Sequence, residues 1–532
     1  MDTKNSKLSI YAPLVLAVVF ALGIYLGNLL NFQSKDNKIS LKSEPNKLDL
    51  IIDLIESDYV DTVSTSDLIE EAVPYILKNL DPHSIYIPAK DLKQVNEPLE
   101  GNFEGIGVQF NLLNDTILVI NTISGGPAEK VGLMAGDKII TINDSLFAGK
   151  KITNEDVIKN LKGEQGTTVK VGVARIGFDK LLSFEITRNK VPLYSVDVAY
   201  MMSEDIGYVK ISAFARTTYD EFMQAVNNLH KQGMKKIVLD LRSNTGGYLD
   251  AAISIIDEFL EKDKLIVYTE GKARPRYEYK ATKNGACLKD ELVVLIDSWS
   301  ASASEIVAGA IQDNDRGTIV GRRSFGKGLV QESSYFRDGS ALRLTIARYY
   351  TPTGRSIQKS YSKGNDEYEL DLLHRYENGE FESADSTVFA DSLKFVTKGG
   401  KIVYGGGGIM PDVFVAVDTL GVTPYFQEIS HKALIYIYAL EYTNKYRTQL
   451  SKLTDYKQII KFLDSKNVFI SFIDYATSKG IKPIEKDIKI SKELIRTNLY
   501  AYIARNIIDN KGYYPIISKV DLTLNKAIEV LK

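Results

Sequence analysis

The stretch ELVVLIDSWSASASEIVAGAIQD, residues 291–313, decides the fold. Its apolar run Leu292–Ile296 predicts a buried strand, and a serine-rich turn then leads into a helix expected over Ala303–Gln312. This layout can place a serine at a helix N-terminus, where free N–H groups can stabilise an oxyanion. Ser302 and Glu305 also fit a helix capping box, which is the alternative interpretation. Because the turn holds more serines than one cap needs, it is a candidate functional site.

Strands and helices alternate on both sides of this stretch. The expected strands are Gly207–Ile211, Lys236–Asp240, Leu265–Thr269, Leu292–Ile296 and Thr318–Val320, and the expected helices are Thr218–Gln232, Leu249–Leu260 and Ala303–Gln312. This order predicts an α/β unit with a largely parallel sheet. Ligands of such sheets gather at the carboxyl ends of the strands, where the serine-rich turn lies.

A second turn, VLDLRSNTGG at residues 238–247, follows another expected strand. Gly246 and Gly247 permit positive φ angles and a close approach of the backbone. The alternative is an ordinary strand-to-helix turn, in which Asp240 and Arg242 form a structural ion pair.

A third segment, VGRRSFGKGLVQESSYF at residues 320–336, places Lys327 between two glycines in an apolar context. If residues 326–336 form a strand, Lys327 and Gln331 share one face, and the amide could hold the lysine in place. A surface hairpin lysine is the alternative. The phosphate-loop pattern GxxxxGK[ST] is absent from the segment.

A serine nucleophile needs a base, and histidine is an unpromising one here. The chain has four histidines, and none follows a strand in a recognisable motif. A lysine can serve if burial lowers its pKa from about 10.4 to roughly 7–8, which disfavours the charged form by roughly 4 kcal/mol. A dry pocket can supply that shift through desolvation.

Composition excludes several classes of protein. The 532 residues carry 66 Lys and Arg against 68 Asp and Glu, a net charge of −2, so a general nucleic-acid binder is not expected. The single cysteine, Cys287, excludes an intramolecular disulfide, and the scattered histidines do not favour a metal site. We expect no metal and no organic cofactor.

The N-terminus carries a candidate membrane anchor. No charged residue occurs from Leu8 to Ser34, and Ile10–Phe32 is almost wholly apolar, a length that suits one membrane-spanning helix. The long apolar run has no convincing cleavage site, which favours an uncleaved anchor over a signal peptide. Lys4 and Lys7 favour a cytoplasmic N-terminus, so the bulk of the chain is expected outside the cytoplasm.

About 90 residues after Gly101 carry short strands with glycine punctuation. We expect strands at 108–110, 117–120, 138–142 and 169–174 and helices at 128–131 and 154–161. GIGV at 105–108 and SGGPAEKVGLMAGDKIITIND at 124–144 resemble a PDZ domain of the circularly permuted bacterial type. The resemblance implies that Gly105, Ile106, Gly107 and Val108 form the loop that receives the C-terminal carboxylate of a peptide. The alternative is that the glycines only make tight turns.

The three candidate segments, residues 238–247, 291–313 and 320–336, together resemble the C-terminal processing (tail-specific) peptidases. These are serine proteases with a Ser–Lys dyad. The resemblance covers about Leu48 to Val415. Its motifs are LDPHSIYI (80–87), the PDZ region, DLRSNTGG (240–247), SASASEI (300–306), SFGKGLVQ (324–331), YYTPTGRSIQ (349–358) and GGGGIMPDV (405–413). It implies a crotonase/ClpP-like α/β protease core with an inserted PDZ domain, an N-terminal helical region and a C-terminal helical region.

The resemblance also implies the roles of individual residues. Ser302 is expected as the nucleophile, Lys327 as the base and Gln331 as the residue that orients this lysine. The backbone N–H groups of Ala303, Gly246 and Gly247 are expected to form the oxyanion hole. Asp313 occupies the position of an acidic residue with a possible supporting role.

The sequence departs from the family pattern in two places. Family members pass quickly from GRSIQ to the PDV segment, whereas residues 359–404 intervene here and are expected to form a polar surface insertion. The expected divisions are an anchor (1–34), a linker with a helical region (35–98), the PDZ domain (99–190), the protease core (191–425) and a C-terminal helical region (426–532). The function of this last region cannot be inferred from its sequence.

The sequence therefore predicts a membrane-anchored serine endopeptidase that recognises protein C-terminal tails. Its expected location is the inner membrane, crossed once, with the catalytic part in the periplasm or another extracytoplasmic space. Its expected partners are proteins with unstructured or apolar C-terminal tails, and a homo-oligomer is possible. The alternative is a catalytically inactive, membrane-tethered PDZ scaffold on a protease fold.

Overall fold

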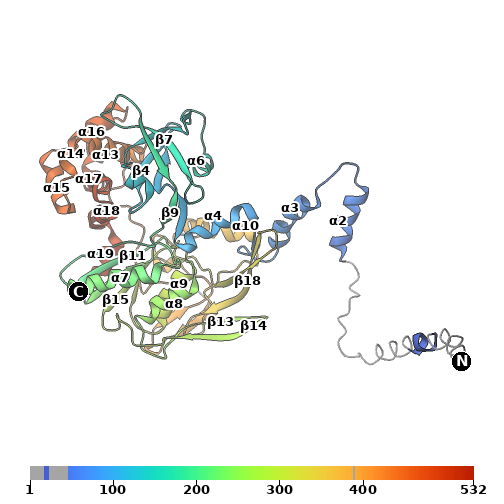
Figure 1. Cartoon of the computed structure of the whole chain (residues 1–532). Helices are drawn as coiled ribbons and strands as arrows, with labels where there is room; N and C mark the ends of the chain where they lie inside the picture. The colour runs from blue at the N-terminus through green and yellow to red at the C-terminus, as the bar shows by residue number, and fades with distance from the viewer. Residues whose placement is uncertain (1–16, 23–45, 388–389) are drawn as a thin grey trace, which may run out of the picture. The chain divides into compact units, whose positions relative to one another are not determined.

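A computed structural model describes residues 17–22, 46–387 and 390–532 of the chain (Figure 1). Two units are distinguished, Met1–Val73 and Pro74–Lys532. In the first unit, residues 17–22 are helical, α2 spans Lys47–Asp58, and α3 (Thr65–Leu77) begins. Most of the predicted anchor lies outside the described residues. Within those residues, no helix combines the length and apolar character that a bilayer span needs.

A six-stranded sheet forms the centre of the predicted protease core, in the second unit. Its strand order is β10-β11-β12-β15-β16-β21, and all neighbours are parallel except β10 and β11. The strands span Val196–Met201, Ile206–Ile211, Lys236–Asp240, Glu291–Ile296, Thr318–Gly321 and Val413–Phe414. The predicted parallel α/β unit is confirmed.

Side chains on these strands alternate between two apolar layers, because successive residues of a strand point to opposite faces. On β15, Leu292, Val294 and Ile296 pack with the helices α7 (Thr218–Lys231), α8 (Leu249–Asp257) and α9 (Ala303–Asp313). Val293 and Leu295 face the other layer, where they pack with Leu524, Ala527 and Leu531 in and after the last helix, α19 (Leu522–Val530). The predicted boundary at residue 425 assigns this helix to a separate region, but it covers one face of the core sheet.

A second sheet carries the remaining strands of the core. Its order is β1-β18-β13-β14, and β17 also pairs with β18. The strands span Ile85–Ile87, Ala341–Tyr350, Leu265–Gly271, Arg274–Lys280 and, for β17, Leu329–Tyr335. The condition set above, a strand over residues 326–336, holds only from Leu329 to Tyr335, so Lys327 lies in a loop before the strand.

The PDZ-like module consists of a sheet, a ribbon and two helices. Its sheet has the order β3-β4-β5-β7-β8, with β6 beside β5, and the ribbon pairs β2 with β9. The strands span Asn102–Gly105, Val108–Leu112, Ile117–Thr122, Lys138–Ile142, Ser145–Leu146, Thr168–Ala174, Leu182–Thr187 and Asn189–Pro192, and the helices span Pro127–Lys130 (α5) and Asn154–Leu161 (α6). The helix α4 (Ala89–Glu100) precedes the module.

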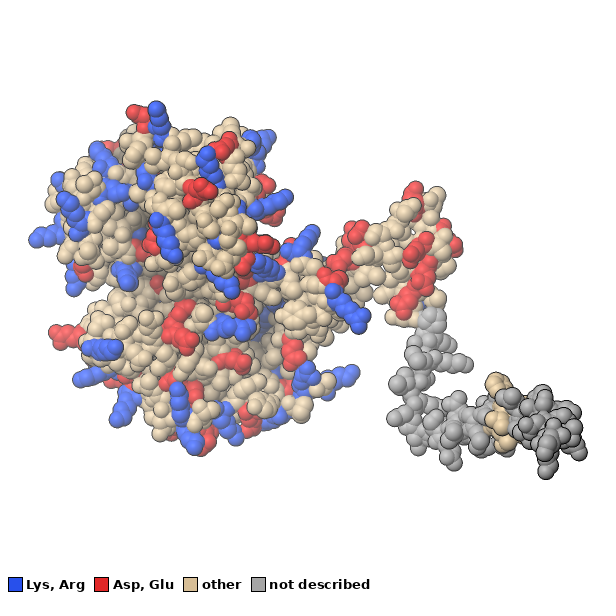
Figure 2. All heavy atoms as spheres, in the orientation of Figure 1, with Lys and Arg blue, Asp and Glu red and all other residues tan. Residues whose placement is uncertain are grey.

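The C-terminal helices α12 to α18 pack around a core of their own, which includes Tyr425, Phe472 and Leu499 (Figure 1). They span Pro424–His431, Leu434–Lys445, Arg447–Leu450, Tyr456–Ser465, Val468–Ser478, Glu485–Ile508 and Asn510–Ile517. Over the visible face of the second unit, acidic and basic side chains are interspersed (Figure 2), as the near-zero net charge suggests.

The segment 359–404 has structure of its own. It contains α10 (Asn365–Glu369), α11 (Asp371–Glu377), two short 3₁₀ turns at 384–386 and 391–393, and a hairpin of β19 (Lys394–Val396) and β20 (Ile402–Tyr404). Tyr368, Arg375 and Glu380 are buried in it. Most of the segment is exposed or half-exposed, as a polar surface insertion should be, but charged side chains such as Arg375 and Glu380 pair with one another beneath its surface.

Candidate active site

Ser302 lies at a strained turn between β15 and α9. Its backbone has a φ of 54° and a ψ of −113°, a left-handed region that a residue with a Cβ rarely adopts. Such strain costs of order 1–3 kcal/mol and persists where the surrounding structure imposes it. The turn is tied to its neighbour by Asp297, which accepts hydrogen bonds from the N–H groups of Ser243 (2.9 Å) and Ser300 (3.1 Å).

The carboxylate of Glu305 joins the turn of Ser302 to the loop of Lys327. Its Oε2 accepts the backbone N–H of Ser302 at 2.8 Å and that of Lys327 at 2.9 Å. Its Oε1 accepts the Ser324 hydroxyl at 2.5 Å and the Gly326 N–H at 2.7 Å. The backbones of Ser302 and Lys327, 25 residues apart in the sequence, therefore share one oxygen atom.

Glu305 is fully buried, with 0% of its surface exposed. Burial raises the pKa of its carboxyl group to about 7, although the four hydrogen bonds oppose this shift. The capping-box pattern predicts only its bond with Ser302. The other three donors come from the Lys327 loop, so the sequence pattern could not reveal that Glu305 connects two segments.

Tyr349 makes a second connection between the same two segments. Its buried hydroxyl donates to the Lys327 carbonyl and lies 3.2 Å from the Ser302 carbonyl oxygen. The tyrosine belongs to the YYTPTGRSIQ motif, but nothing in the sequence assigns it to this place. Glu305 therefore binds the N–H groups of Ser302 and Lys327, and Tyr349 contacts the carbonyl oxygens of the same two residues.

The side chain of Lys327 is largely withdrawn from water. Burial, and secondarily the charge of Arg343, lowers the pKa of its amine below the usual range, while Asp81 and Glu305 act in the opposite direction. The amine Nζ donates to Gln331 Oε1 at 2.9 Å, and the Gln331 amide donates to the His83 carbonyl. The predicted proximity of Lys327 and Gln331 is confirmed, although Lys327 precedes the strand.

The side chains of Ser302 and Lys327 are not directly bonded. In the described part of the chain, no hydrogen bond joins Ser302 Oγ to Lys327 Nζ, because the amine is turned to Gln331. A neutral amine that donates one proton to Gln331 retains its lone pair, which is the feature that a general base needs.

His83 lies beside this lysine and is not among the predicted site residues. Burial and the charge of Lys327 lower its pKa to about 4, so its imidazole is neutral at pH 7. Its Nε2 lies 2.9 Å from the Tyr368 hydroxyl. The histidine belongs to the LDPHSIYI motif, and its backbone carbonyl holds Gln331.

The predicted oxyanion donors surround the Ser302 turn, but one of them is already occupied. The Gly246 N–H donates to Asn244 Oδ1 at 2.8 Å. A Cβ at Gly246 would lie 2.8 Å from the Ser302 Cβ, so the glycine is needed for close approach rather than for its N–H. The N–H groups of Ala303 and Gly247 have no acceptor among the described residues.

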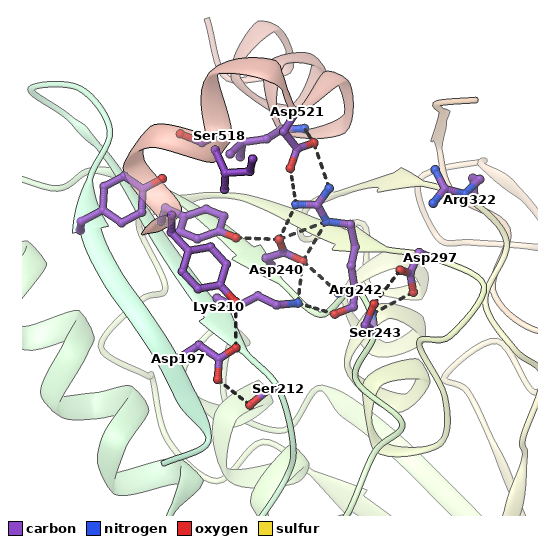
Figure 3. Close-up of a pocket in the computed structure, with 15 residues that line it drawn as sticks. Asp197, Lys210, Ser212, Asp240, Arg242, Ser243, Asp297, Arg322, Ser518 and Asp521 are labelled. Atoms are coloured by element: carbon purple, nitrogen blue, oxygen red, sulfur yellow. Dashed lines mark hydrogen bonds and ion pairs between the residues drawn. The ribbon is translucent and has the colours of Figure 1, made fainter. Parts of the chain in front are cut away.

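A charged network fixes the turn at residues 240–247 and lines a cavity of about 400 Å³ (Figure 3). Arg242 lies between two carboxylates, at 2.6 Å from Asp240 and 2.7 Å from Asp521. Burial raises the pKa of Asp240, but Arg242 and Lys210 outweigh it and hold the pKa below the usual range. The interpretation of Asp240 and Arg242 as a structural ion pair is confirmed, and Asp521 extends the pair to the C-terminal segment.

Asp313 is not brought to Ser302. Ser302 precedes α9 and Asp313 ends it, and at 1.5 Å per residue this separates them by roughly 16 Å. The Asp313 carboxylate pairs with the buried Arg355 at 2.7 Å and accepts the Thr353 hydroxyl at 2.6 Å. Its contacts therefore hold the YYTPTGRSIQ segment.

The predicted carboxylate loop of the PDZ-like module lies between β2 and β3. Gly105 ends β2, Ile106 is buried, Gly107 has a φ of +79°, and Val108 begins β3. In its sheet, β3 pairs only with β4, so its other edge can accept an added strand. Among the described residues, no group of three or more His, Cys, Asp or Glu is arranged to hold a metal ion.

Three segments of the chain match known families. Residues 205–365 match peptidase family S41, residues 105–187 match the PDZ domain, and residues 425–509 match a family of unknown function, DUF8443. These matches confirm the expected fold class, a ClpP-like α/β protease domain with a PDZ domain and a C-terminal helical region.

Two sequence relatives agree with the family matches, and one solved structure is also similar. A carboxy-terminal-processing protease of Bartonella bacilliformis is 35% identical over 351 residues, covering 64% of this chain and 80% of the relative. The carboxy-terminal processing protease CtpB of Bacillus subtilis is 35% identical over 317 residues, covering 59% and 65%. A solved photosystem II D1 C-terminal processing protease is 26% identical, with a TM-score of 0.36, covering 69% of this chain and 92% of that chain.

Proposed function

The chain belongs to the carboxy-terminal processing proteases of peptidase family S41, and from this premise we propose that Ser302 is its nucleophile and Lys327 its general base. The observation that carries the proposal is that one oxygen of Glu305 accepts the backbone N–H groups of both residues. This shared acceptor holds the two backbones close to each other. The lowered pKa of the buried Lys327 amine supports a neutral base.

The reaction follows from these roles. Lys327 Nζ accepts the proton of Ser302 Oγ as this oxygen attacks the carbonyl carbon of the peptide bond. The tetrahedral oxyanion accepts hydrogen bonds from the backbone N–H groups of Ala303 and Gly247. Lys327 then gives its proton to the leaving amine. Water hydrolyses the acyl-enzyme with the same lysine as base. Gln331 holds the Lys327 amine in place by accepting a hydrogen bond from one of the N–H groups of the amine.

The PDZ domain supplies substrate choice. A protein tail adds to the free edge of β3, and its carboxylate is received by the backbone of Gly105–Val108. The apolar stretch Ile10–Phe32 anchors the enzyme in the inner membrane, with the protease on the extracytoplasmic side. Deletion of residues 1–34 should move the protein from the membrane fraction to the soluble fraction, and continued sedimentation with membranes would refute the anchor.

Two single substitutions test the dyad. Ser302→Ala and Lys327→Ala should each abolish cleavage of an unstructured protein with an apolar tail, because each removes one partner of the proton transfer. Binding of the tail peptide, measured by fluorescence anisotropy, should be unchanged in both variants. Cleavage retained by either variant would refute the dyad, and absence of cleavage in the unmutated chain would favour an inactive scaffold.

A further inference from the structure

The segment 359–404 packs on the loop that carries Lys327. This loop, residues 322–328, connects β16 to β17. Arg375 of α11 donates to the carbonyl oxygens of two loop residues, Arg323 at 2.7 Å and Ser324 at 3.0 Å. Arg375 is 3% exposed, so these bonds are shielded from water.

Glu380 connects the two arginines. It accepts Arg375 Nε at 2.9 Å, and its two oxygens accept the Arg323 guanidinium at 2.6 Å each. Glu380 is 6% exposed. Charge-assisted, bidentate bonds of this kind are strong and geometrically specific. The loop backbone is therefore held through Arg375, and a loop side chain through Glu380.

Tyr368 and Lys359 also contact the loop, through the ring of Phe325. The Lys359 amine lies 4.0 Å from the ring centres of both Phe325 and Tyr368 and pairs with Asp371 at 3.0 Å. The Tyr368 hydroxyl meets His83, whose carbonyl oxygen accepts the Gln331 amide. Since Gln331 binds the Lys327 amine, Tyr368 reaches the proposed base through two intervening residues.

We propose that this insertion is a clamp, formed by Tyr368, Asp371, Arg375 and Glu380, that positions Lys327 for catalysis. The clamp touches no reacting atom and acts through the loop and through Gln331, so its members are positioning residues. The inference rests on the proposed role of Lys327. It assigns a task to a segment that departs from the family pattern.

The clamp has a consequence for the pH dependence of the reaction. The charged and titratable groups around Lys327 are Arg343 on β18, Asp81 and His83 before β1, and Glu305 on α9. None belongs to the clamp, so loosening the clamp changes the hydration of the amine rather than its neighbouring charges. Hydration favours the charged amine, and the acid limb of the rate profile should move to higher pH.

The test compares variants of the full chain with a quenched fluorescent peptide that has an apolar free carboxyl end. Arg375→Met should lower kcat by about 10²-fold, as expected for a misplaced catalytic group, with little change in KM, and should shift the acid limb upward. Arg375→Lys keeps the charge but lacks the planar guanidinium that bridges both carbonyls and Glu380, so it should not restore kcat. The control is Leu373→Ser on the same helix, whose side chain is 50% exposed and should have no effect.

A second variant makes the test independent of folding defects. Tyr368→Phe removes only the hydroxyl that meets His83, and it should lower kcat and shift the acid limb in the same direction. An acid limb that stays in place in Arg375→Met, Arg375→Lys and Tyr368→Phe would overturn the clamp, as would full rescue by Arg375→Lys. Failure of the dyad proposal itself would be a separate result, because Ser302→Ala or Lys327→Ala would then still cleave the peptide.

Discussion

At the scale of single residues, Ser302 and Lys327 are held by their backbones. Glu305 accepts both N–H groups, and Tyr349 lies at both carbonyl oxygens. These contacts impose the strained φ angle on Ser302. Four donors converge on one carboxylate, two on each oxygen, so both acceptor atoms are required.

Glu305→Gln should lower kcat by about 10²-fold, because an amide NH₂ group would face two of the four donors and displace the Ser302 turn or the Lys327 loop. Leaving buried N–H groups unpaired should also reduce the free energy of unfolding by about 1–3 kcal/mol. Peptide-cleavage kinetics and urea unfolding measure the two effects. Glu332→Gln on β17, where the side chain is half exposed, is the matched control, and equal kinetics in the two variants would contradict the role of Glu305.

At the scale of elements, the last helix is joined to the turn that lies beside Ser302. Asp521 caps α19 by accepting the Leu524 N–H at 3.0 Å, and it also pairs with Arg242. Arg242 belongs to the turn that continues to Gly246 and Gly247. The C-terminal helix therefore stabilises the backbone from which one proposed oxyanion donor comes.

Asp521→Asn should lower the free energy of unfolding by at most about 3 kcal/mol, because it removes one of the two carboxylates that pair with Arg242, whose side chain is 20% exposed. Asparagine is itself a good helix cap, so the loss reports the ion pair rather than the cap. Asp455→Asn, at the cap of α15, provides the matched change, since in the described parts of the chain Asp455 pairs with no arginine. Urea unfolding should show a larger loss for Asp521→Asn, and equal losses would show that the pair with Arg242 contributes nothing.

The elements of the core sheet could be predicted from the sequence, because apolar runs on buried strands are local signals. The strand at Lys236–Asp240 has the predicted bounds, and α9 ends one residue later than expected. The role of Glu305 could not be predicted, since three of its donors lie about 20 residues away. The packing of α19 on the sheet could not be predicted either, because the apolar face of this helix is compatible with any apolar surface.

At the scale of the whole molecule, the proposed sites of tail recognition and of cleavage lie in different parts of the chain. The PDZ domain has an apolar core of its own, which includes Ile117, Val157 and Val171. The protease core has separate layers on both faces of its sheet. A change in the carboxylate loop should therefore affect the affinity for a tail without affecting the chemical step.

Gly107→Ala should raise KM for a peptide with a free carboxyl end and leave kcat unchanged. Gly107 has a φ of +79°, which an alanine adopts only with strain, and an added Cβ would lie 3.2 Å from the Val191 side chain, which would have to give way. Discrimination against the same peptide with an amidated end should be lost. Gly125→Ala is the control, because it has a similar φ of +77° with open space around its Cβ. Unchanged discrimination by Gly107→Ala would contradict tail capture by this loop.

The most direct test of the proposed dyad is the rate at which a fluorophosphonate labels the chain as a function of pH, with the labelled residue located by peptide mass spectrometry. We expect the label on Ser302, at a rate that rises with pH and reaches its plateau below the ordinary lysine pKa of about 10.4, because burial lowers the pKa of Lys327. Lys327→Ala should remove this labelling. Labelling of another residue, or an equal rate in Lys327→Ala, would contradict the account.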